Sequence, residues 1–484
     1  MQFNSLEFVI FLPVVVTGFY LTPHTWRWIW LCAAGCWMFT RAPLFVLPLL
    51  AVALVEYYMA ILIERSTNGG PGRAGIYCAI GVTFPLILLT FFKYHPYNSV
   101  IIPLGLSYYT LQGISYIIEV KRGAVAAERH FGIFLLYFLF FPKITAGPIE
   151  RPDLLRQFRE RHRLEYSNIA DGMKIIACGF FKKLVVADRV GVVVNEVYNN
   201  ADCYHGIYLI LATILFAVQV YCDFSGYTDI ARGSARLMGF RLMENFRYPY
   251  GSTSLSEFWR RWHISLSTWF RDYVYIPMGG SRVARGRLYG NLFTVFILSG
   301  YWHGAGWNFV AWGALHGMMM ILGSATGNAR KKLVHSMGMD ALPRLHRMLK
   351  TAATASLVCF AWIFFRADSV TQALMIIRRI ASGIGDIAAS LFRLDSAYLR
   401  SITDIARFNT ILGFSRDTYR PEMLIAVASI AFLWLFNSLQ KRIDFWERLS
   451  EKNVLLRWSL YGSIIIAILL FGMFTNEQFI YFRF

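Results

Sequence analysis

Three of the ten histidines lie in aromatic, weakly charged surroundings where an imidazole could do chemistry: His263, His303 and His316. His303 is the sharpest candidate, because it follows Trp302 in an apolar stretch, and an ionisable group at membrane depth usually lines a functional cavity. A buried neutral imidazole can take a proton from a hydroxyl or thiol near pH 7. The pattern therefore favours a general base, and the alternative is a hydrogen-bonded structural histidine between helices.

Three glycines, at positions 300, 304 and 306, surround His303. They predict a discontinuous helix or hairpin at membrane depth, and they would let a substrate approach the backbone closely. His263 and His316 are weaker candidates, because their partners cannot be read from spacing. No third ligand at suitable spacing accompanies the histidines, so we expect no metal site.

Two carboxylates, Asp223 and Asp229, lie beside aromatic residues in the middle of the chain. They either orient histidines or pair with Arg232 and Arg236, and the salt-bridged structural role is favoured. The sequence has no Gly-x-Ser-x-Gly elbow, no phosphate-binding loop and no dinucleotide fingerprint. Serine-hydrolase and nucleotide-driven chemistry therefore lack support.

The elements that must position these groups are apolar helices. The 484 residues are 56% hydrophobic and only 16% charged, with a mean hydropathy of +0.45, and several uncharged runs reach the roughly 17–20 residues that cross a bilayer. We expect a polytopic membrane protein with spans within residues 6–22, 43–63, 75–92, 99–118, 206–222, 304–323, 357–365 with its flanks, 423–436 and 458–474.

Other stretches fit a span less well. Residues 131–141 are apolar but short, with basic flanks, and predict a re-entrant half-helix. Residues 223–288 are too charged to span and should lie at or just inside the cytoplasmic surface. Residues 366–422 are amphipathic around 373–384, and their side of the membrane is open. No basic segment precedes the first apolar run, so we expect a retained first span and no cleaved signal.

The net charge of +19 is concentrated between the apolar runs. With the N-terminus outside, residues 64–73, 119–130 and 150–174 then face the cytoplasm, as the positive-inside bias requires. The positive charge is therefore better explained by membrane topology than by nucleic-acid binding. A cationic inner face also suits a polyanionic cytosolic cofactor. The seven cysteines have no regular spacing, which argues against disulfides and zinc.

Longer motifs carry a resemblance to a known family. Residues 258–272 read Phe-Trp-Arg-Arg-Trp-His-Ile-Ser-Leu-Ser-Thr-Trp-Phe-Arg-Asp, which resembles a signature of the membrane-bound O-acyltransferases, in their bacterial alginate O-acetyltransferase-like branch. Residues 141–149, 221–229, 244–250 and 273–280 are also similar to this branch, as are the Trp-His-Gly at 302–304, the Trp-Gly and His-Gly at 312–317, and the Phe-Ile-Tyr-Phe-Arg-Phe at 479–484.

The resemblance implies a fold and roles. It implies an all-α polytopic protein with a ring of about 10–12 transmembrane helices, plus re-entrant and surface helices, around a central funnel. It implies one domain, with N-terminal spans at 1–120, a catalytic core at about 130–325 and C-terminal spans at 350–484. His303 would be the catalytic histidine and His263 the supporting one. The candidate substrate-binding residues are Trp302, Trp262, Asp223, Arg260, Arg261 and, with lower weight, His316.

The implied activity is transfer of an acetyl or similar short acyl group from a cytoplasmic thioester, such as acetyl-CoA, for O-acetylation of an exported polysaccharide. We expect no permanently bound cofactor and no metal. Expected partners are the acyl-CoA donor, an extracytoplasmic acetyltransferase and membrane lipids, but no nucleic acid, and the expected location is the bacterial cytoplasmic membrane. The alternatives are a transporter or scaffold with a histidine gate, and an O-acyltransferase acting on a lipid or protein. No repeat of the inverted-halves type supports a transporter.

Overall fold

A computed structural model of the chain describes residues 1–40, 43–67, 71–94, 103, 105–393, 395, 416–440, 453–474 and 479–480. These residues form helices, turns and loops, and no strand occurs among them. The expected all-α class is therefore confirmed. Tyr481–Phe484, four of the six residues of the final aromatic motif, lie outside the described residues.

Among the described residues, five helices are long and apolar enough to cross a membrane, or six crossings if α14 and α15, bent by 58° at their junction, form one broken span. The expected membrane-spanning character is confirmed, and the ring of 10–12 helices stays a prediction. The five are α3 (Val46–Thr67), α4 (Pro71–Tyr94), α10 (Gly206–Leu237), α16 (Pro343–Arg366) and α22 (Val454–Phe471), and the bent pair is α14 (Trp307–Ala325) and α15 (Gly327–Ser336).

Helix α10 differs from the sequence-based expectation. The expected span ended at residue 222, because charged residues follow, but the helix continues to Leu237. Its charges have partners: Asp223 receives a hydrogen bond from Lys183 at 2.6 Å, and Arg232 pairs with Asp229 at 3.3 Å. Paired charges cost far less to bury than isolated ones. The charged block therefore does not end the span.

The chain forms two compact units, and each contains several separate stretches of sequence. Unit 1 holds Met1–Gly179, Tyr227–Arg247 and His263–Met278, and unit 2 holds Phe180–Gly226, Tyr248–Trp262 and Gly279–Phe484. The single-domain expectation stays a prediction. The two units are described separately below.

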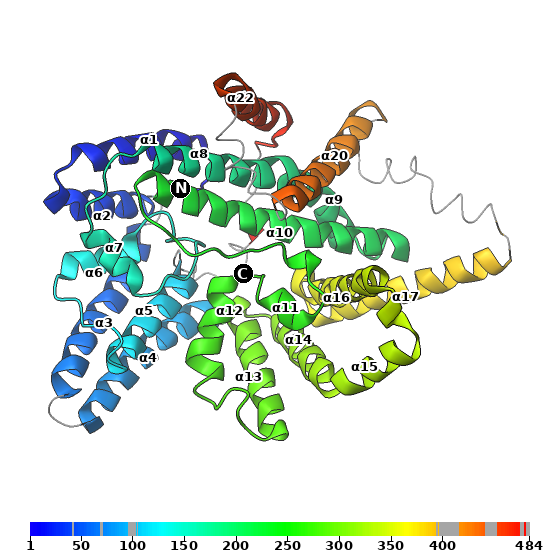
Figure 1. Cartoon of the computed structure of the whole chain (residues 1–484), viewed down its shortest axis with the longest axis horizontal. Helices are drawn as coiled ribbons and strands as arrows, with labels where there is room; N and C mark the ends of the chain where they lie inside the picture. The colour runs from blue at the N-terminus through cyan, green and yellow to red at the C-terminus, as the bar shows by residue number, and fades with distance from the viewer. Residues whose placement is uncertain are drawn as a thin grey trace. The chain divides into compact units, whose positions relative to one another are not determined.

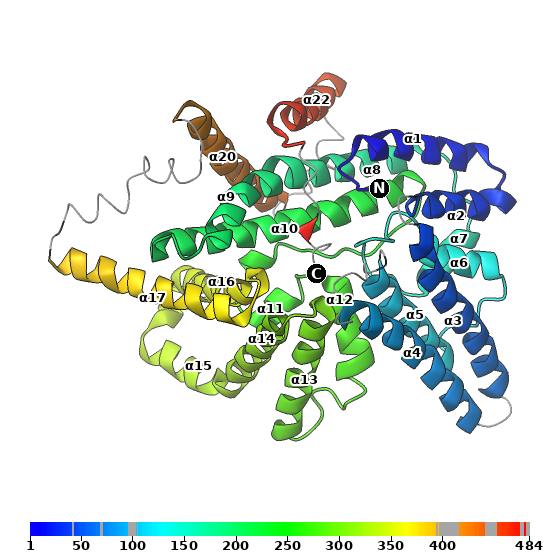
Figure 2. The same ribbon diagram turned by 180° about the vertical axis from the view of Figure 1, so that it is seen from behind.

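Unit 1 is built around apolar helices that pack closely. α3 lies beside α4 (Figures 1 and 2) and also packs against α5 (Leu106–Lys121). Glu56 of α3 is fully buried against Gly113 of α5, where a Cβ would lie 1.9 Å from Glu56 Oε2. Only glycine fits there. Both carboxylate oxygens of Glu56 are buried without a hydrogen-bond partner among the described residues.

The apolar run at 131–141 forms a short helix, α6 (Phe131–Leu139), and most of its side chains are buried. A buried loop follows and contains Lys143, which donates hydrogen bonds to Gln112 Oε1 and to the Tyr137 carbonyl. The helix is too short to span, as predicted, and its re-entrant placement in a membrane stays a prediction. The remaining helices of unit 1 are α1 (Leu6–Leu21), α2 (Arg27–Trp37), α7 (Asp153–Arg159), most of α8 (Tyr166–Phe180) and α12 (Ile264–Phe270).

Unit 2 is organised around a helical hairpin. α13 (Arg285–His303) and α14 pack side by side along their length (Figures 1 and 2). α17 (Val370–Phe392) covers the stretch expected to be amphipathic. A π-helical segment, Phe181–Ala187, runs into α9 (Asp188–Asn199), and unit 2 also includes α11 (Leu255–Trp259) and α20 (Arg416–Gln440).

Candidate active site

His303 is the last residue of α13 and is only 4% exposed. Aromatic rings surround its imidazole, with centroids at 4.9 Å for Trp302, 5.0 Å for Trp312 and 5.4 Å for Phe365. An imidazole is a side chain that can act as a general base toward a hydroxyl.

Two of the three glycines around His303 lie close to α14. A Cβ at Gly300 would lie 2.4 Å from the Phe309 carbonyl oxygen, and one at Gly304 would lie 2.2 Å from the Phe309 ring. A side chain at either of these two positions would therefore clash with α14. The expectation that a substrate approaches the backbone at these glycines stays a prediction. The hairpin expected at this break is present, with α13 ending at His303 and α14 beginning at Trp307.

His316 lies one turn after Trp312 on α14 and is fully buried. Its ring is 5.0 Å from Trp312 and 4.9 Å from Trp259 between centroids. Both of its ring nitrogens, and the indole nitrogens of Trp312 and Trp259, are buried without a hydrogen-bond partner among the described residues. Leaving such a group unsatisfied costs about 1–3 kcal/mol.

Trp262 belongs to the same aromatic cluster. It stacks on Phe258 at 5.5 Å and contacts Trp362 at 5.1 Å, and Trp362 in turn lies 6.0 Å from Trp312. The Trp362 indole donates to the Tyr250 hydroxyl at 3.1 Å. The structure thus joins Trp262, Trp302, His303 and His316 through Trp312 and Trp362. Trp362 was not singled out from the sequence, because a single aromatic residue in an apolar span gives no distinctive signal.

Asp223, expected among the substrate-binding residues, sits in a buried charge cluster. Lys183 Nζ lies 2.6 Å from Asp223 Oδ1 and 2.7 Å from Asp188 Oδ1. The Ile480 N–H donates to Asp223 Oδ2 at 2.8 Å, and Lys183 Nζ lies 4.4 Å from the Phe479 ring centroid. Both carboxylate oxygens of Asp223 are engaged within the protein. Lys183 was not identified from the sequence, since nothing in its spacing marks it as the partner.

The two arginines of the signature lie at the end of α11. Arg260 is exposed, and its guanidinium donates to Ser256 Oγ at 3.4 Å. Arg261 pairs with Glu257 at 2.5 Å. Arg260 is therefore the more accessible of the two for an anionic ligand.

His263 belongs to unit 1. Its backbone is left-handed, with φ of 43°, and it precedes α12. The start of α12 is fixed by Asn245, whose carbonyl accepts from Ile264 N at 3.0 Å and whose side chain accepts from Ser265 N at 3.2 Å. Ser265 Oγ in turn accepts from Ile149 N at 3.0 Å. Burial lowers the pKa of His263 to about 3, so this ring is neutral at physiological pH.

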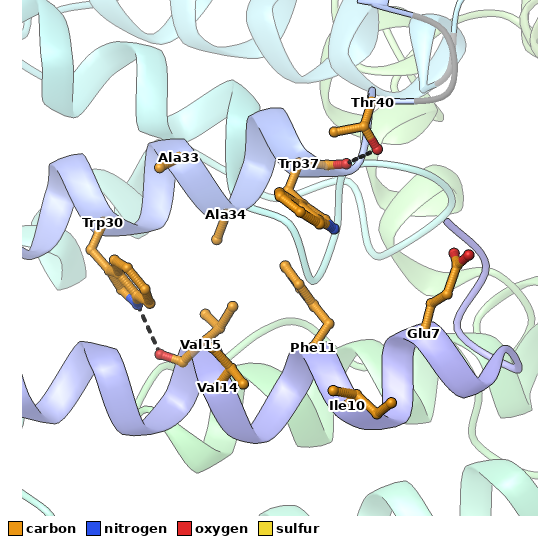
Figure 3. A pocket seen from close by; sticks show the side chains of 10 residues that line it. All are labelled: Glu7, Ile10, Phe11, Val14, Val15, Trp30, Ala33, Ala34, Trp37 and Thr40. Atoms are coloured by element: carbon orange, nitrogen blue, oxygen red, sulfur yellow. Dashed lines mark hydrogen bonds between the residues drawn. The ribbon is translucent and has the colours of Figure 1, made fainter.

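A cavity of about 660 Å³ lies in unit 1 between α1 and α2 (Figure 3). Phe11 and Trp37 point toward this space, and the Trp30 indole closes one side by donating to the Val15 carbonyl at 2.9 Å. The lining is mostly apolar and includes none of the candidate site residues. No group of three metal-binding side chains occurs among the described residues.

Comparisons with known proteins agree with this architecture. The sequence model of the membrane-bound O-acyltransferase family matches residues 82–337. A Pseudomonas putida protein described as a probable alginate O-acetylase is 33% identical over 90% of this chain and 93% of its own length. A Helicobacter pylori peptidoglycan O-acetyltransferase is 28% identical over 100% of this chain and 97% of its own length.

A more distant relative is a Bacillus subtilis teichoic acid D-alanyltransferase, 30% identical over 56% of this chain and 71% of its own length. All three relatives have names that describe transfer of an acyl group. The expected family resemblance is confirmed, and so is the enzymatic character of the chain. The chain belongs to the membrane-bound O-acyltransferase family, and it is an integral membrane O-acyltransferase.

Proposed function

We propose that this enzyme moves an acetyl or similar short acyl group from a cytoplasmic thioester, such as acetyl-CoA, toward an exported polysaccharide. The observation that carries the proposal is His303, a buried imidazole at a helix end inside an aromatic shell. Support comes also from relatives named as alginate O-acetylases and as a peptidoglycan O-acetyltransferase. The proposed location is the bacterial cytoplasmic membrane.

The reaction is acyl transfer to a hydroxyl. The hydroxyl oxygen attacks the thioester carbonyl carbon and forms the new C–O bond. The C–S bond breaks, and the electron pair leaves with the thiolate. His303 takes the hydroxyl proton as general base and returns it to the thiolate, so the products are an ester and a free thiol.

Other residues have supporting roles in this proposal. The exposed guanidinium of Arg260 is suited to a CoA phosphate, because guanidinium groups match phosphate geometry. Arg261 would join it by giving up its pairing with Glu257. Trp302 and Trp262 would bound the donor's acyl end, and His263 is proposed as the supporting histidine. An extracytoplasmic acetyltransferase would pass the group on to the polymer.

The experiment is a single substitution with a matched control. We expect His303→Ala in purified protein, reconstituted in liposomes, to lose CoA release from acetyl-CoA by about 10²–10⁴-fold. The control is His335→Ala, because His335 is 88% exposed on α15 and lies outside the site. Both variants should insert and purify like the wild type. Full turnover by His303→Ala would end the proposal.

The same assay separates the rival functions. A transporter or scaffold with a histidine gate would release no CoA from acetyl-CoA. A lipid or protein acceptor would be recognised by the appearance of the labelled acyl group on that molecule in place of polysaccharide. Transfer to polysaccharide that depends on a co-expressed extracytoplasmic acetyltransferase is the expected result.

A further inference from the structure

In the aromatic cluster of unit 2, the side chains of three residues carry four buried polar atoms that have no hydrogen-bond partner among the described residues. They are His316 Nδ1, His316 Nε2, Trp312 Nε1 and Trp259 Nε1. His316 is fully buried, and Trp312 is 1% exposed. Proteins rarely leave buried donors and acceptors without partners, and such groups in a native structure are often ones with a catalytic or ligand-binding role. Four such atoms in mutually contacting rings mark a site.

The chemistry of these atoms limits the guest. Each indole N–H can only donate, and a neutral imidazole offers one donor and one acceptor. The set therefore presents three donors and one acceptor. It suits a group rich in oxygen lone pairs and does not suit a cation. The surrounding rings, Phe296 at 6.0 Å from His316 and Phe365 at 5.3 Å from Trp312, add apolar walls.

The position of Trp312 ties this set to the proposed chemistry. The centroid of its ring lies 5.0 Å from that of His303 and 5.0 Å from that of His316. A group that accepts a hydrogen bond from the Trp312 N–H is therefore bound by a ring that contacts His303, the proposed general base. An oxyanion that develops during acyl transfer is stabilised by hydrogen-bond donors aimed at it, and the Trp312 N–H belongs to a ring that contacts the proposed base.

The packing of the hairpin limits the size of the guest. A Cβ at Gly300 would lie 2.4 Å from the Phe309 carbonyl oxygen, and one at Gly313 would lie 2.3 Å from the Phe296 carbonyl oxygen. The two helices therefore approach as closely as their backbones allow beside Trp312. This close packing leaves no room for a long acyl chain beside Trp312.

We infer that Trp312, Trp259 and His316 form a subsite that holds the carbonyl oxygen of the acyl group and restricts the donor to short acyl chains. The inference rests on the proposed function and deepens it. The indole N–H groups donate to the carbonyl oxygen, His316 completes the donor set, and the aromatic walls enclose the methyl group.

The test removes the donors while keeping the aromatic bulk. We expect Trp312→Phe and Trp259→Phe each to lower kcat with acetyl-CoA by about 10²–10³-fold, the effect of losing one such donor, with little change in KM. His316→Gln should lower kcat less, because glutamine keeps a donor. The matched control is Trp307→Phe on the same helix, since Trp307 is 79% exposed, and it should act like the wild type.

A second measurement does not depend on turnover or on perfect folding of every variant. The probe is a ¹³C=O ketone analogue of acetyl-CoA in which a methylene replaces the sulfur. Its carbonyl stretch should shift to lower frequency when it binds the wild type or Trp307→Phe, and the shift should shrink in Trp312→Phe and His316→Gln. The relative rate with propionyl-CoA should also rise in Trp312→Phe.

The outcomes separate this inference from the proposed function. A wild-type protein that releases no CoA from acetyl-CoA overturns both. An active wild type whose Trp312→Phe and Trp259→Phe variants keep kcat within about two-fold, with an unchanged carbonyl shift, overturns the subsite alone and leaves the four atoms to buried water.

Discussion

The charge cluster around Lys183 and the aromatic cluster around Trp312 are both buried in unit 2, but they treat their polar atoms in opposite ways. Lys183 bonds two carboxylates, and both oxygens of Asp223 have partners inside the protein. The aromatic cluster keeps four polar atoms without a hydrogen-bond partner among the described residues. Asp223 and His316 looked alike as candidate ligand residues in the sequence, and only their partners distinguish them.

The contrast gives a physical criterion for assigning roles. A buried polar group whose bonds are complete already has its stabilising contacts and gains little from a ligand. A buried group with incomplete bonds destabilises the free protein and becomes favourable when a ligand satisfies it. We therefore assign stability to the Lys183 cluster and ligand binding to the Trp312 cluster.

The largest expected effect on stability comes from removing one charge of the Lys183 cluster. Asp223→Asn should lower the free energy of unfolding by about 3–5 kcal/mol, because it breaks a buried ion pair and leaves a charge only partly compensated. The measurement is an SDS unfolding titration in mixed micelles. A loss below about 1 kcal/mol, combined with a selective loss of acetyl-CoA turnover, would reverse the assignment.

Glu56 of unit 1 is a buried polar group with incomplete hydrogen bonding, like those of the aromatic cluster. Its carboxylate oxygens are buried without hydrogen-bond partners among the described residues, so Glu56→Met should raise the free energy of unfolding by about 1–3 kcal/mol, the cost of an unsatisfied polar group. The same SDS titration measures it. Destabilisation by Glu56→Met would mean that the carboxyl group makes a stabilising interaction and that the criterion fails here.

The dependence of stability on pH tests the burial of a polar group at His263. Burial lowers its pKa to about 3 from 6.5, so the unfolded chain binds a proton below pH 6.5 that the folded chain does not. Stability should therefore be full above pH 6.5 and fall as the pH drops, by up to about 1.4 kcal/mol per pH unit. The loss should be weaker in His263→Asn, which tolerates the left-handed backbone. Equal acid slopes for wild type and variant would contradict a buried neutral ring.

The smallest effect is expected at an exposed ion pair that serves as the reference. Arg156 and Glu160 lie 3.5 Å apart with side chains that are 82% and 52% exposed. Glu160→Gln should change the free energy of unfolding by less than about 0.5 kcal/mol. A larger change would show that the SDS titration does not isolate the effect of burial.

The sequence predicted what depends on local pattern. The apolar runs identified most of the membrane helices, the glycines before Trp307 identified the hairpin, and the motifs identified the family. The catalytic role of His303 stays a prediction. It misplaced the end of α10, because the partner of Asp223 lies 40 residues away on another helix and spacing cannot reveal it. It also could not show that Gly300 lets α14 approach closely, since glycine can make room for a ligand or for a neighbouring helix.

Other features of the site depend on contacts between residues that are far apart in the sequence. Trp312 and Trp362 became visible as the links between Trp262 and the histidines only when α11, α14 and α16 were brought together. Whether a buried nitrogen has a partner is likewise a property of the folded chain. The orphaned atoms of His316 therefore had no signature in the sequence.

The bond from Ile480 to Asp223 also sets an order of events during biosynthesis. Asp223 emerges from the ribosome 257 residues before the N–H group that completes its hydrogen bonding, so α10 must be accommodated in the bilayer while Oδ2 of this carboxylate still lacks its partner. Proteins fold progressively as they are synthesised, so this contact can close only after Ile480 has been made. A nascent chain that stops before residue 480 lacks the hydrogen bond from Ile480 to Asp223.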